Sequence, residues 1–171
     1  SRWRPADASR VAAMTLVHAA VDIAAPAQRV WDVVMDPNRL GEWVTIHRGV
    51  SEVPPLPLRR GAAFEQSLTL RGAPLHVSWT VEDVDPPRRA VWSGRGPAHS
   101  RARIVYALEP TATGTRFDYT NEFKPPGGPL GAVAGRVLVG GLSHREAQRS
   151  LQRLKRLIEE GGTDRARALD W

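Results

Sequence analysis

Between residues 45 and 123 the chain is built from short strand-like segments, and the connectors between them are too short to hold a crossover helix. Strands that run parallel need a connection of about a dozen residues or more, so these segments are expected to pair as hairpins in an antiparallel sheet. The connectors, at residues 54–61, 72–74, 85–87 and 111–114, each contain Pro or Gly. The expected strands are Thr45–Val53, Ala63–Arg71, Leu75–Asp85, Arg89–Gly94, Ser100–Leu108 and Thr115–Phe123.

Apolar and polar residues alternate along these segments, which predicts a sheet with one covered face and one wet face. On the segment that begins at residue 63, Phe64, Gln66 and Leu68 take covered positions, whereas Glu65 points outward. An earlier segment, Leu16–Ile23, shows the same alternation and is expected to be the first strand.

Three further segments carry helix signals. Pro26 suits the first turn of a short helix that ends before Pro37, and a second short helix is expected over Pro37–Trp43. A long terminal helix is expected over about Gly128–Glu160, closed by Gly161–Gly162, because apolar residues recur there at helical spacings. Such a helix of roughly 30 residues is about 45 Å long, enough to cross the sheet.

The composition fits one domain and excludes several classes of protein. The chain has 171 residues and no Cys, which excludes thiol catalysis and zinc-thiolate sites. Residues 14–162 are expected to form a single domain, flanked by flexible tails at residues 1–13 and 163–171. No apolar run approaches the roughly 20 residues of a membrane span, and the amino end lacks a signal-peptide core. We therefore expect a soluble cytoplasmic protein.

The stretch from Val21 to Pro37, followed by Trp43, resembles the opening of the START-like polyketide cyclase/dehydrase and lipid transport family, which is of the SRPBCC type. Later landmarks of that family are matched by Gly61 with Phe64, Asp85–Arg88, Gly114–Arg116 and Leu151–Glu160. The resemblance covers about residues 15–161. It implies an α+β helix-grip fold, in which an antiparallel sheet of six to seven strands wraps around a long C-terminal helix and two short helices follow the first strand.

The same resemblance implies a cavity between sheet and helix that holds lipids, steroids, polyketides or other hydrophobic molecules. The covered positions of the strands supply large aromatic side chains that suit a planar apolar ligand, together with a few polar groups. The residues expected to bind the ligand are Trp43, Phe64, Gln66, Trp79, Trp92, Tyr106, Phe117, Tyr119, Asn121, Val137, Gly141 and His144. Each of them could instead belong only to the core, and its polar groups could bond to the protein itself.

The sequence offers little support for catalysis. Ser143 and His144 are helix neighbours about 100° apart, so they cannot converge in a Ser-His-Asp unit. The acidic residues of the strands fall on the wet face, which leaves no inward pair of carboxylates. The five His residues show no metal-ligand spacing, and phosphate and dinucleotide motifs are missing, so neither a metal nor a cofactor is expected.

In the aromatase/cyclase members, the resemblance implies an inward Arg on a central strand, and the strand beginning at Ala63 lacks one. Tyr106, Tyr119 and His144 are the candidate catalytic acids or bases. We favour a protein that binds, carries or sequesters a hydrophobic small molecule, such as a polyketide, an enediyne-type natural product or a lipid. A polyketide aromatase/cyclase-type enzyme is the alternative.

A second alternative comes from Glu42–Arg48, which looks like a stretch found in START-like toxins of toxin-antitoxin pairs. Action on RNA would need a basic surface, and the net charge is +6. However, Arg101, Arg103 and Arg116 share the wet face with Asp118, and no exposed aromatic platform accompanies them. The expected partner is thus a hydrophobic small molecule and not a nucleic acid, and we expect a monomer or a weak dimer.

Overall fold

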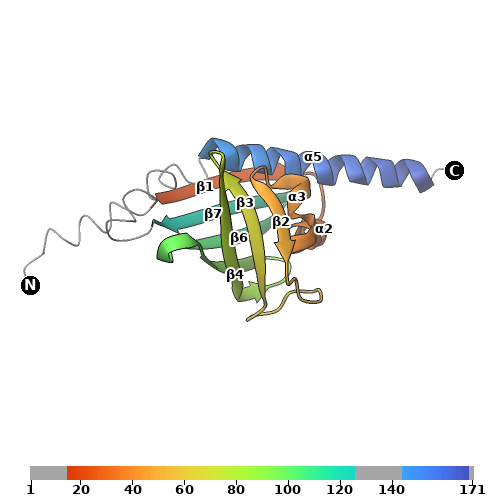
Figure 1. Ribbon diagram of the computed structural model, residues 1–171. Helices are drawn as coiled ribbons and strands as arrows, with labels where there is room; N and C mark the ends of the chain where they lie inside the picture. Colours follow the sequence, from red (N-terminus) through yellow and green to blue (C-terminus); the bar gives the residue numbers. More distant parts are fainter. Residues whose placement is uncertain (1–14, 126–143, 170–171) are drawn as a thin grey trace, which may run out of the picture.

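The computed structural model describes residues 15–125 and 144–169, with side chains described up to residue 162. It contains a seven-stranded antiparallel sheet with a long helix lying along it (Figure 1), so the expected α+β helix-grip architecture is confirmed. The strands are β1 (Thr15–Ile23), β2 (His47–Ser51), β3 (Ala63–Leu70), β4 (Ala73–Asp85), β5 (Arg89–Arg95), β6 (Arg101–Thr111) and β7 (Gly114–Lys124). The helices are α2 (Ala27–Val34), α3 (Leu40–Trp43) and α5 (His144–Leu169), with the 3-10 turns η1 (Pro37–Arg39) and η2 (Pro97–His99).

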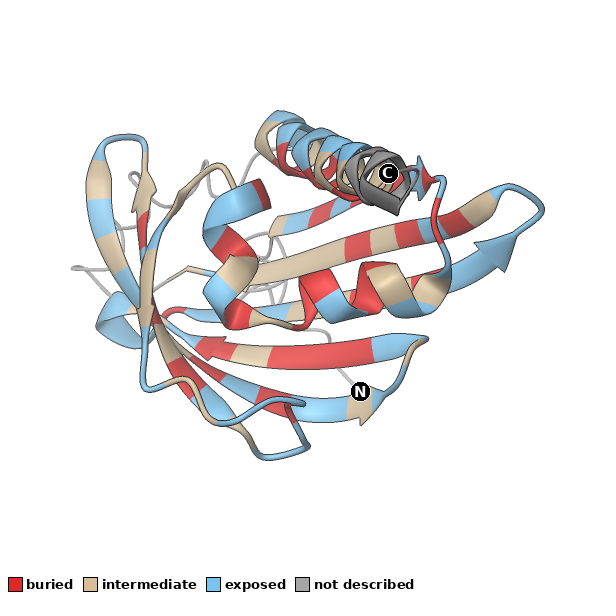
Figure 2. Ribbon diagram, turned by 90° about the vertical axis from the view of Figure 1, so that its right-hand side faces the viewer, coloured by how far each residue is buried: buried red, intermediate tan, exposed pale blue. Residues whose placement is uncertain are grey.

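The sheet is a meander whose first strand pairs with its last. The strand order is β1-β7-β6-β5-β4-β3-β2, and α2, η1 and α3 carry the chain from β1 at one edge to β2 at the other. Register shifts interrupt the β2–β3 pair between His47 and Gly49 and the β4–β5 pair between Val81 and Asp83. Such bulges bend and twist strands, and the sheet curves around the helices (Figure 2).

The alternation in the sequence correctly predicts which side of the sheet is covered. Phe64, Gln66 and Leu68 are buried on β3, and on the neighbouring strands Trp79 is 7% exposed and Phe117 is fully buried. These side chains belong to one buried cluster with residues of α2, α3 and α5. The three helices lie over the concave face of the sheet (Figure 2). Fully burying an apolar side chain of this size stabilises the fold by about 2 to 3 kcal/mol.

Helix α5 packs its buried side against β1 and α3. The buried residues recur every three or four positions, as a helix with one apolar stripe requires; they are Ala147, Ser150, Leu151, Leu154 and Ile158. Figure 2 shows this stripe facing the sheet. The first part of the expected helix, residues 128–143, lies outside the described residues.

The prediction that Gly161 and Gly162 close the terminal helix is wrong, because α5 continues through both to Leu169. The guanidinium of Arg29, on α2, explains why residue 162 is a glycine. Its Nη2 donates a hydrogen bond to the carbonyl oxygen of Ile158 at 2.7 Å, and a Cβ at position 162 would lie 2.5 Å from its Nη1. Glycine therefore serves here to let a side chain approach the helix closely, not to end the helix.

Replacing Gly162 by Ala should have opposite effects in two backgrounds. In the native chain the new methyl group pushes Arg29 off Ile158, and the lost charged hydrogen bond, about 1.5 to 3 kcal/mol, outweighs the gain in helix propensity of about 1 kcal/mol. In a protein that also carries Arg29→Ala, the same substitution should stabilise the fold by about 1 kcal/mol, because only the gain in helix propensity remains. Urea unfolding of the four proteins in this double-mutant cycle measures both effects. Stabilisation of equal size in both backgrounds would contradict this role for Gly162.

Candidate functional site

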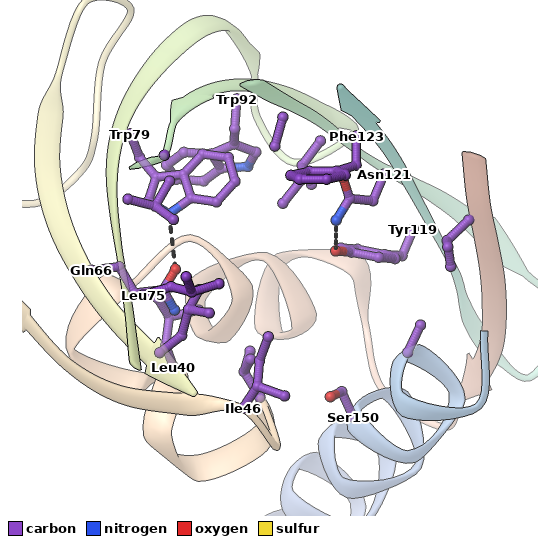
Figure 3. Close-up of a pocket in the computed structure, with 18 of the residues that line it drawn as sticks. Leu40, Ile46, Gln66, Leu75, Trp79, Trp92, Tyr119, Asn121, Phe123 and Ser150 are labelled. Carbon is purple, nitrogen blue, oxygen red and sulfur yellow. Dashed lines mark hydrogen bonds between the residues drawn. The ribbon is translucent and has the colours of Figure 1, made fainter. Parts of the chain in front are cut away.

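A cavity of about 140 Å³ lies between the concave face of the sheet, the α3 region and the start of α5. Its wall is formed mainly by aliphatic and aromatic side chains (Figure 3). Of the residues expected to bind a ligand, those on this wall are Trp43, Phe64, Gln66, Trp79, Trp92, Tyr106, Tyr119 and Asn121. Strand parity therefore correctly predicts the side of the sheet on which the strand residues among them lie, because covered positions on a curved sheet converge on the space that it encloses. That these residues bind a ligand stays a prediction.

Two of the expected residues lie elsewhere. Phe117 is fully buried in the core, where its ring packs edge-on against Tyr106 and Trp43, and it is not on the cavity wall. His144 is exposed at the first residue of α5, so its expected inward position is wrong. The buried stripe of α5 begins at Ala147, one turn further on. Val137 and Gly141, which were also expected in the lining, lie outside the described residues.

Tyr106 is the centre of the aromatic part of the wall. Ring centroids of Trp92 on β5, Tyr119 on β7 and Trp43 on α3 lie 5.8, 6.1 and 6.3 Å from that of Tyr106. Aromatic rings at these separations and tilts attract one another through their quadrupoles. The wall is therefore held in a defined shape by contacts among its own rings, and it presents flat apolar surfaces to the cavity.

Gln66 is held at both ends by hydrogen bonds. Its Oε1 accepts from the indole Nε1 of Trp79 at 2.8 Å, and its Nε2 donates to Nδ1 of His47 at 2.9 Å. An indole nitrogen can only donate, which fixes the orientation of the Gln66 amide. Nδ1 of His47 must then accept, so the ring proton sits on Nε2 and the imidazole is neutral.

His47 was not among the residues expected at the site. It lies behind Gln66, not on the cavity wall, and a Cβ added to Gly41 would lie 3.4 Å from its ring. The one signal for it in the sequence is indirect: Gln66 takes a covered position, and a buried amide must find partners. Nothing in the strand pattern identifies which partner that is.

Burial lowers the pKa of His47 below its ordinary value of 6.5. Since the unfolded chain binds this proton more readily than the folded one, the folded state should lose stability as the pH falls below about 6.5. Subtracting the stability–pH curve of His47→Gln, which can still accept from Gln66 but does not titrate, isolates this contribution. Chemical denaturation between about pH 7 and pH 5 measures it. A difference curve that is flat over this range, or that rises toward acid, would contradict the prediction.

The two tyrosines of the wall remain protonated over the physiological pH range. Burial raises the pKa of Tyr106 and of Tyr119, and it outweighs the hydrogen bond that Tyr119 accepts from Nδ2 of Asn121 at 3.1 Å. Their phenols can donate hydrogen bonds to a bound molecule. They are poorly suited to act as general bases, which require a pKa near the working pH.

The connector between α3 and β2 is fastened to α5. The backbone nitrogen of Thr45 donates to Oγ of Ser150 at 3.1 Å, and Oγ1 of Thr45 donates to Oε2 of Glu146 at 2.8 Å. Val44 and Ile46, on either side of Thr45, both line the cavity. This part of the wall is therefore tied to the helix by polar contacts as well as by packing.

The polar cluster on the outer face of β3 and β4 does not form a catalytic arrangement. On the outer face Nε2 of His76 and Oγ of Ser78 both bond to Oε2 of Glu65, at 2.6 and 2.7 Å. Because Ser78 donates to the carboxylate and not to the imidazole, His76 does not activate it as a nucleophile. Within the described residues, no three His, Asp or Glu side chains are grouped to hold a metal ion. None of the described helices is long and apolar enough to cross a membrane.

Comparison with known proteins identifies one family. A sequence profile of the family described as polyketide cyclase / dehydrase and lipid transport matches residues 14–159. The uncharacterized protein Rv1546 of Mycobacterium tuberculosis is 29% identical over 129 residues, which cover 74% of this chain and 90% of the relative. Toxin Rv0910 of the same organism is 24% identical over 127 residues, which cover 73% of this chain and 88% of the relative.

Solved structures show the same fold. The crystal structure of Zhui aromatase/cyclase from Streptomyces sp. R1128 matches with a TM-score of 0.70 at 18% identity, over 85% of this chain and 94% of the other. At this level of identity the likeness concerns the fold, and a fold hosts many activities.

Proposed function

The chain belongs to the polyketide cyclase/dehydrase and lipid transport family, and on this basis we propose that it binds and carries a hydrophobic small molecule in the cavity between the sheet and α5. The observation that carries the proposal is the apolar cavity with its wall of mutually packed rings. An apolar cavity that stays dry can take up an apolar molecule of matching size.

The volume of the cavity limits that molecule. An engineered cavity of about 150 Å³ in another protein holds one benzene ring, whereas drug-sized ligands occupy pockets of about 300 to 1,000 Å³. With about 140 Å³, this cavity fits a molecule of one-ring size without rearrangement. A polycyclic polyketide, an enediyne-type product or a long-chain lipid exceeds this volume, so it would have to extend beyond the cavity or displace part of the wall.

Binding can be tested with ethylbenzene as the probe. We expect it to shift the indole ¹H–¹⁵N signals of Trp43 and Trp92, whose rings line the cavity. Val77→Phe, on the inner face of β4, should fill the cavity and abolish the shifts, whereas Thr80→Phe, on the exposed face of the same strand, should leave them intact. Absence of shifts in the native protein, or equal shifts in both variants, would refute ligand binding in this cavity.

A cyclase-type activity is the alternative, favoured by the two phenols on the wall and by the shared fold with an aromatase/cyclase. Carriage is preferred because both phenols have a raised pKa, Gln66 is occupied by internal hydrogen bonds, and His144 lies outside the cavity. Incubation with a linear or partly cyclised polyketide separates the two functions. Cyclised product that forms with the native protein but not with Tyr119→Phe would establish an enzyme and overturn the preference for carriage.

A toxin function is the second alternative, favoured by the 24% identity to Toxin Rv0910. The stretch that resembles toxins is largely engaged in internal contacts: Trp43 is buried in the core, Thr45 bonds to α5, and His47 supports Gln66. Induced expression in a bacterial host tests this alternative. Growth arrest that persists in Val77→Phe would show a toxic activity independent of the cavity.

A further inference from the structure

Three positively charged side chains lie next to one another on the outer face of the sheet. Arg101 on β6 is the cross-strand partner of Arg95 on β5 and, on its other side, of Lys124 on β7. Directly opposite residues share a face of a sheet, so the three form a row across neighbouring strands, about 10 Å from the first backbone to the last. All three side chains are exposed. We call Arg95, Arg101 and Lys124 the cationic row.

The cationic row has no counter-charge of its own within the described part of the chain. None of its side chains takes part in a hydrogen bond or an ion pair there. Other arginines of the outer face do have partners: Arg103 lies 3.5 Å from the carboxylate of Glu82, and Arg116 lies 3.0 Å from that of Asp118. Like charges directly opposite each other on a sheet repel, so the row destabilises the fold unless anions from outside lie over it.

The carboxylates nearest to the row in the strand register face other groups. Glu122 is the cross-strand partner of Arg103, and it reduces the positive charge beside the row without cancelling three cations. Glu65 lies two strands beyond Arg95 and already bonds to His76 at 2.6 Å. The row therefore presents a positive potential to solvent.

Exposed apolar side chains lie beside the cationic row. Leu16 on β1 is 65% exposed, and because it pairs with Glu122 it is the diagonal neighbour of Lys124 on the same face. The turn η2, which connects β5 to β6, exposes Pro97 and Ala98. Figure 1 shows the start of β1, the end of β7 and η2 at the same end of the sheet. Positive charge and apolar surface are thus combined at this end.

This combination fits an anionic lipid bilayer better than a nucleic acid. Lysine and arginine are attracted to the negative surface of such a bilayer, and apolar side chains beside them can leave water for the boundary between headgroups and acyl chains. Single-stranded nucleic acid is bound with the help of aromatic side chains on which its bases stack. Among the described residues no aromatic side chain is exposed, and an exposed leucine offers a phosphate nothing.

We propose that the cationic row, Leu16 and the turn η2 form a docking surface for an anionic lipid bilayer. The three cations lie against the negatively charged headgroups, and the apolar side chains enter the boundary region below them. Pro97 and Arg101 also line the cavity, so the docked face adjoins the cavity wall. The inference goes beyond the proposed function, because docking does not require that the cavity holds a ligand.

Sedimentation with lipid vesicles tests the charge of this surface. The native protein should bind vesicles made of equal parts of phosphatidylserine and phosphatidylcholine, and it should bind vesicles of phosphatidylcholine alone far more weakly. Each cation near such a surface contributes roughly 5-fold to binding, so neutralising all three should weaken it by roughly 100-fold. The variant is Arg95→Gln combined with Arg101→Gln and Lys124→Gln. Failure of the native protein to bind the phosphatidylserine vesicles would overturn the inference.

A second triple variant separates the row from the overall charge of the protein. Arg59→Gln, Arg153→Gln and Arg156→Gln together remove the same charge from exposed positions elsewhere, and binding should stay within about 3-fold of the native value at physiological salt. Equal weakening in the two triple variants would show that only net charge acts, and it would overturn the inference. The row variant breaks no contact and relieves repulsion, so it should unfold at no lower urea concentration than the native protein.

The apolar part of the surface distinguishes a bilayer from a nucleic acid. Leu16→Asn should weaken binding to the phosphatidylserine vesicles by roughly 3- to 10-fold. Leu56→Asn is the matched control, because Leu56 is 47% exposed but lies in the connector before β3, and it should have no effect. Equal vesicle binding by the two leucine variants would exclude Leu16 from the surface and overturn its assignment. Binding of a single-stranded uridine oligomer under conditions where the vesicles are not bound would make the partner a nucleic acid and overturn the proposal.

Discussion

Replacing Trp79 by Ala is expected to lower the free energy of unfolding by about 3 to 5 kcal/mol. The ring is 7% exposed and lies flat on Gly94, where an added Cβ would sit 2.6 Å from a ring carbon. The substitution removes this packing and also leaves Oε1 of Gln66 without its donor. Since whole domains are stable by only about 5 to 15 kcal/mol, the variant should be close to unfolding at room temperature. Urea denaturation followed by far-ultraviolet circular dichroism measures the change.

Trp79→Phe is the matched control, because it keeps a ring over Gly94 but loses the indole N–H. It should lower the free energy of unfolding by about 1 to 3 kcal/mol. This loss comes from leaving Oε1 of Gln66 without a donor and from a smaller loss of packing. Equal losses in both variants would show that the hydrogen bond to Gln66 dominates. A loss below about 1 kcal/mol for Trp79→Ala would show that the ring does not support this side of the sheet.

Replacing Gly114 by Ala is expected to lower the free energy of unfolding by about 3 kcal/mol or more. Gly114 opens β7 at a φ of 157°, and a Cβ there would collide with the carbonyl oxygen of Ile23 and lie 2.9 Å from the backbone nitrogen of Ala25. The obstacles are backbone atoms, which cannot rotate away as a side chain can. The buried hydroxyl of Thr115 also donates to the carbonyl oxygen of Ala25 at 2.7 Å, so any shift there breaks a second contact.

Gly72→Ala provides the comparison, because Gly72 has a φ of 79° but nothing lies within 4 Å of an added Cβ. It should lower the free energy of unfolding by about 1 to 2 kcal/mol, which is the strain of holding alanine at a positive φ. Chemical denaturation of both variants measures the difference. A loss for Gly114→Ala that does not exceed the loss for Gly72→Ala would show that the end of β1 can move away from β7.

The parts of the site that follow from strand parity could be predicted from the sequence. Phe64, Gln66 and Trp79 reach the cavity because alternate residues of a strand share one face, and that face was visible in the alternation of apolar and polar residues. Phe117 takes the same parity but lies in the core, because parity gives the side of the sheet and not the position of a side chain under the helices.

The contacts that depend on three-dimensional approach could not be predicted. The pairing of His47 with Gln66 joins residues of two strands whose register is shifted by a bulge, and a bulge leaves no clear mark in the residue pattern. From the sequence alone, Gly162 is interpreted as marking the end of the helix, because glycine is common just after helices. Its actual partner, Arg29, is far away in the sequence and is brought to α5 only by the packing of α2.

The bonds of Thr45 to Ser150 and Glu146 affect how fast a molecule enters, as distinct from how tightly it binds. Because they join the α3–β2 connector to α5, a molecule that enters there must break polar contacts in the same step that separates the apolar surfaces. Pro97 of η2 also lines the cavity, and the next two residues, Ala98 and His99, hold left-handed φ values of 54° and 63°, a conformation that costs non-glycine residues free energy. Release of that strain favours movement of the turn.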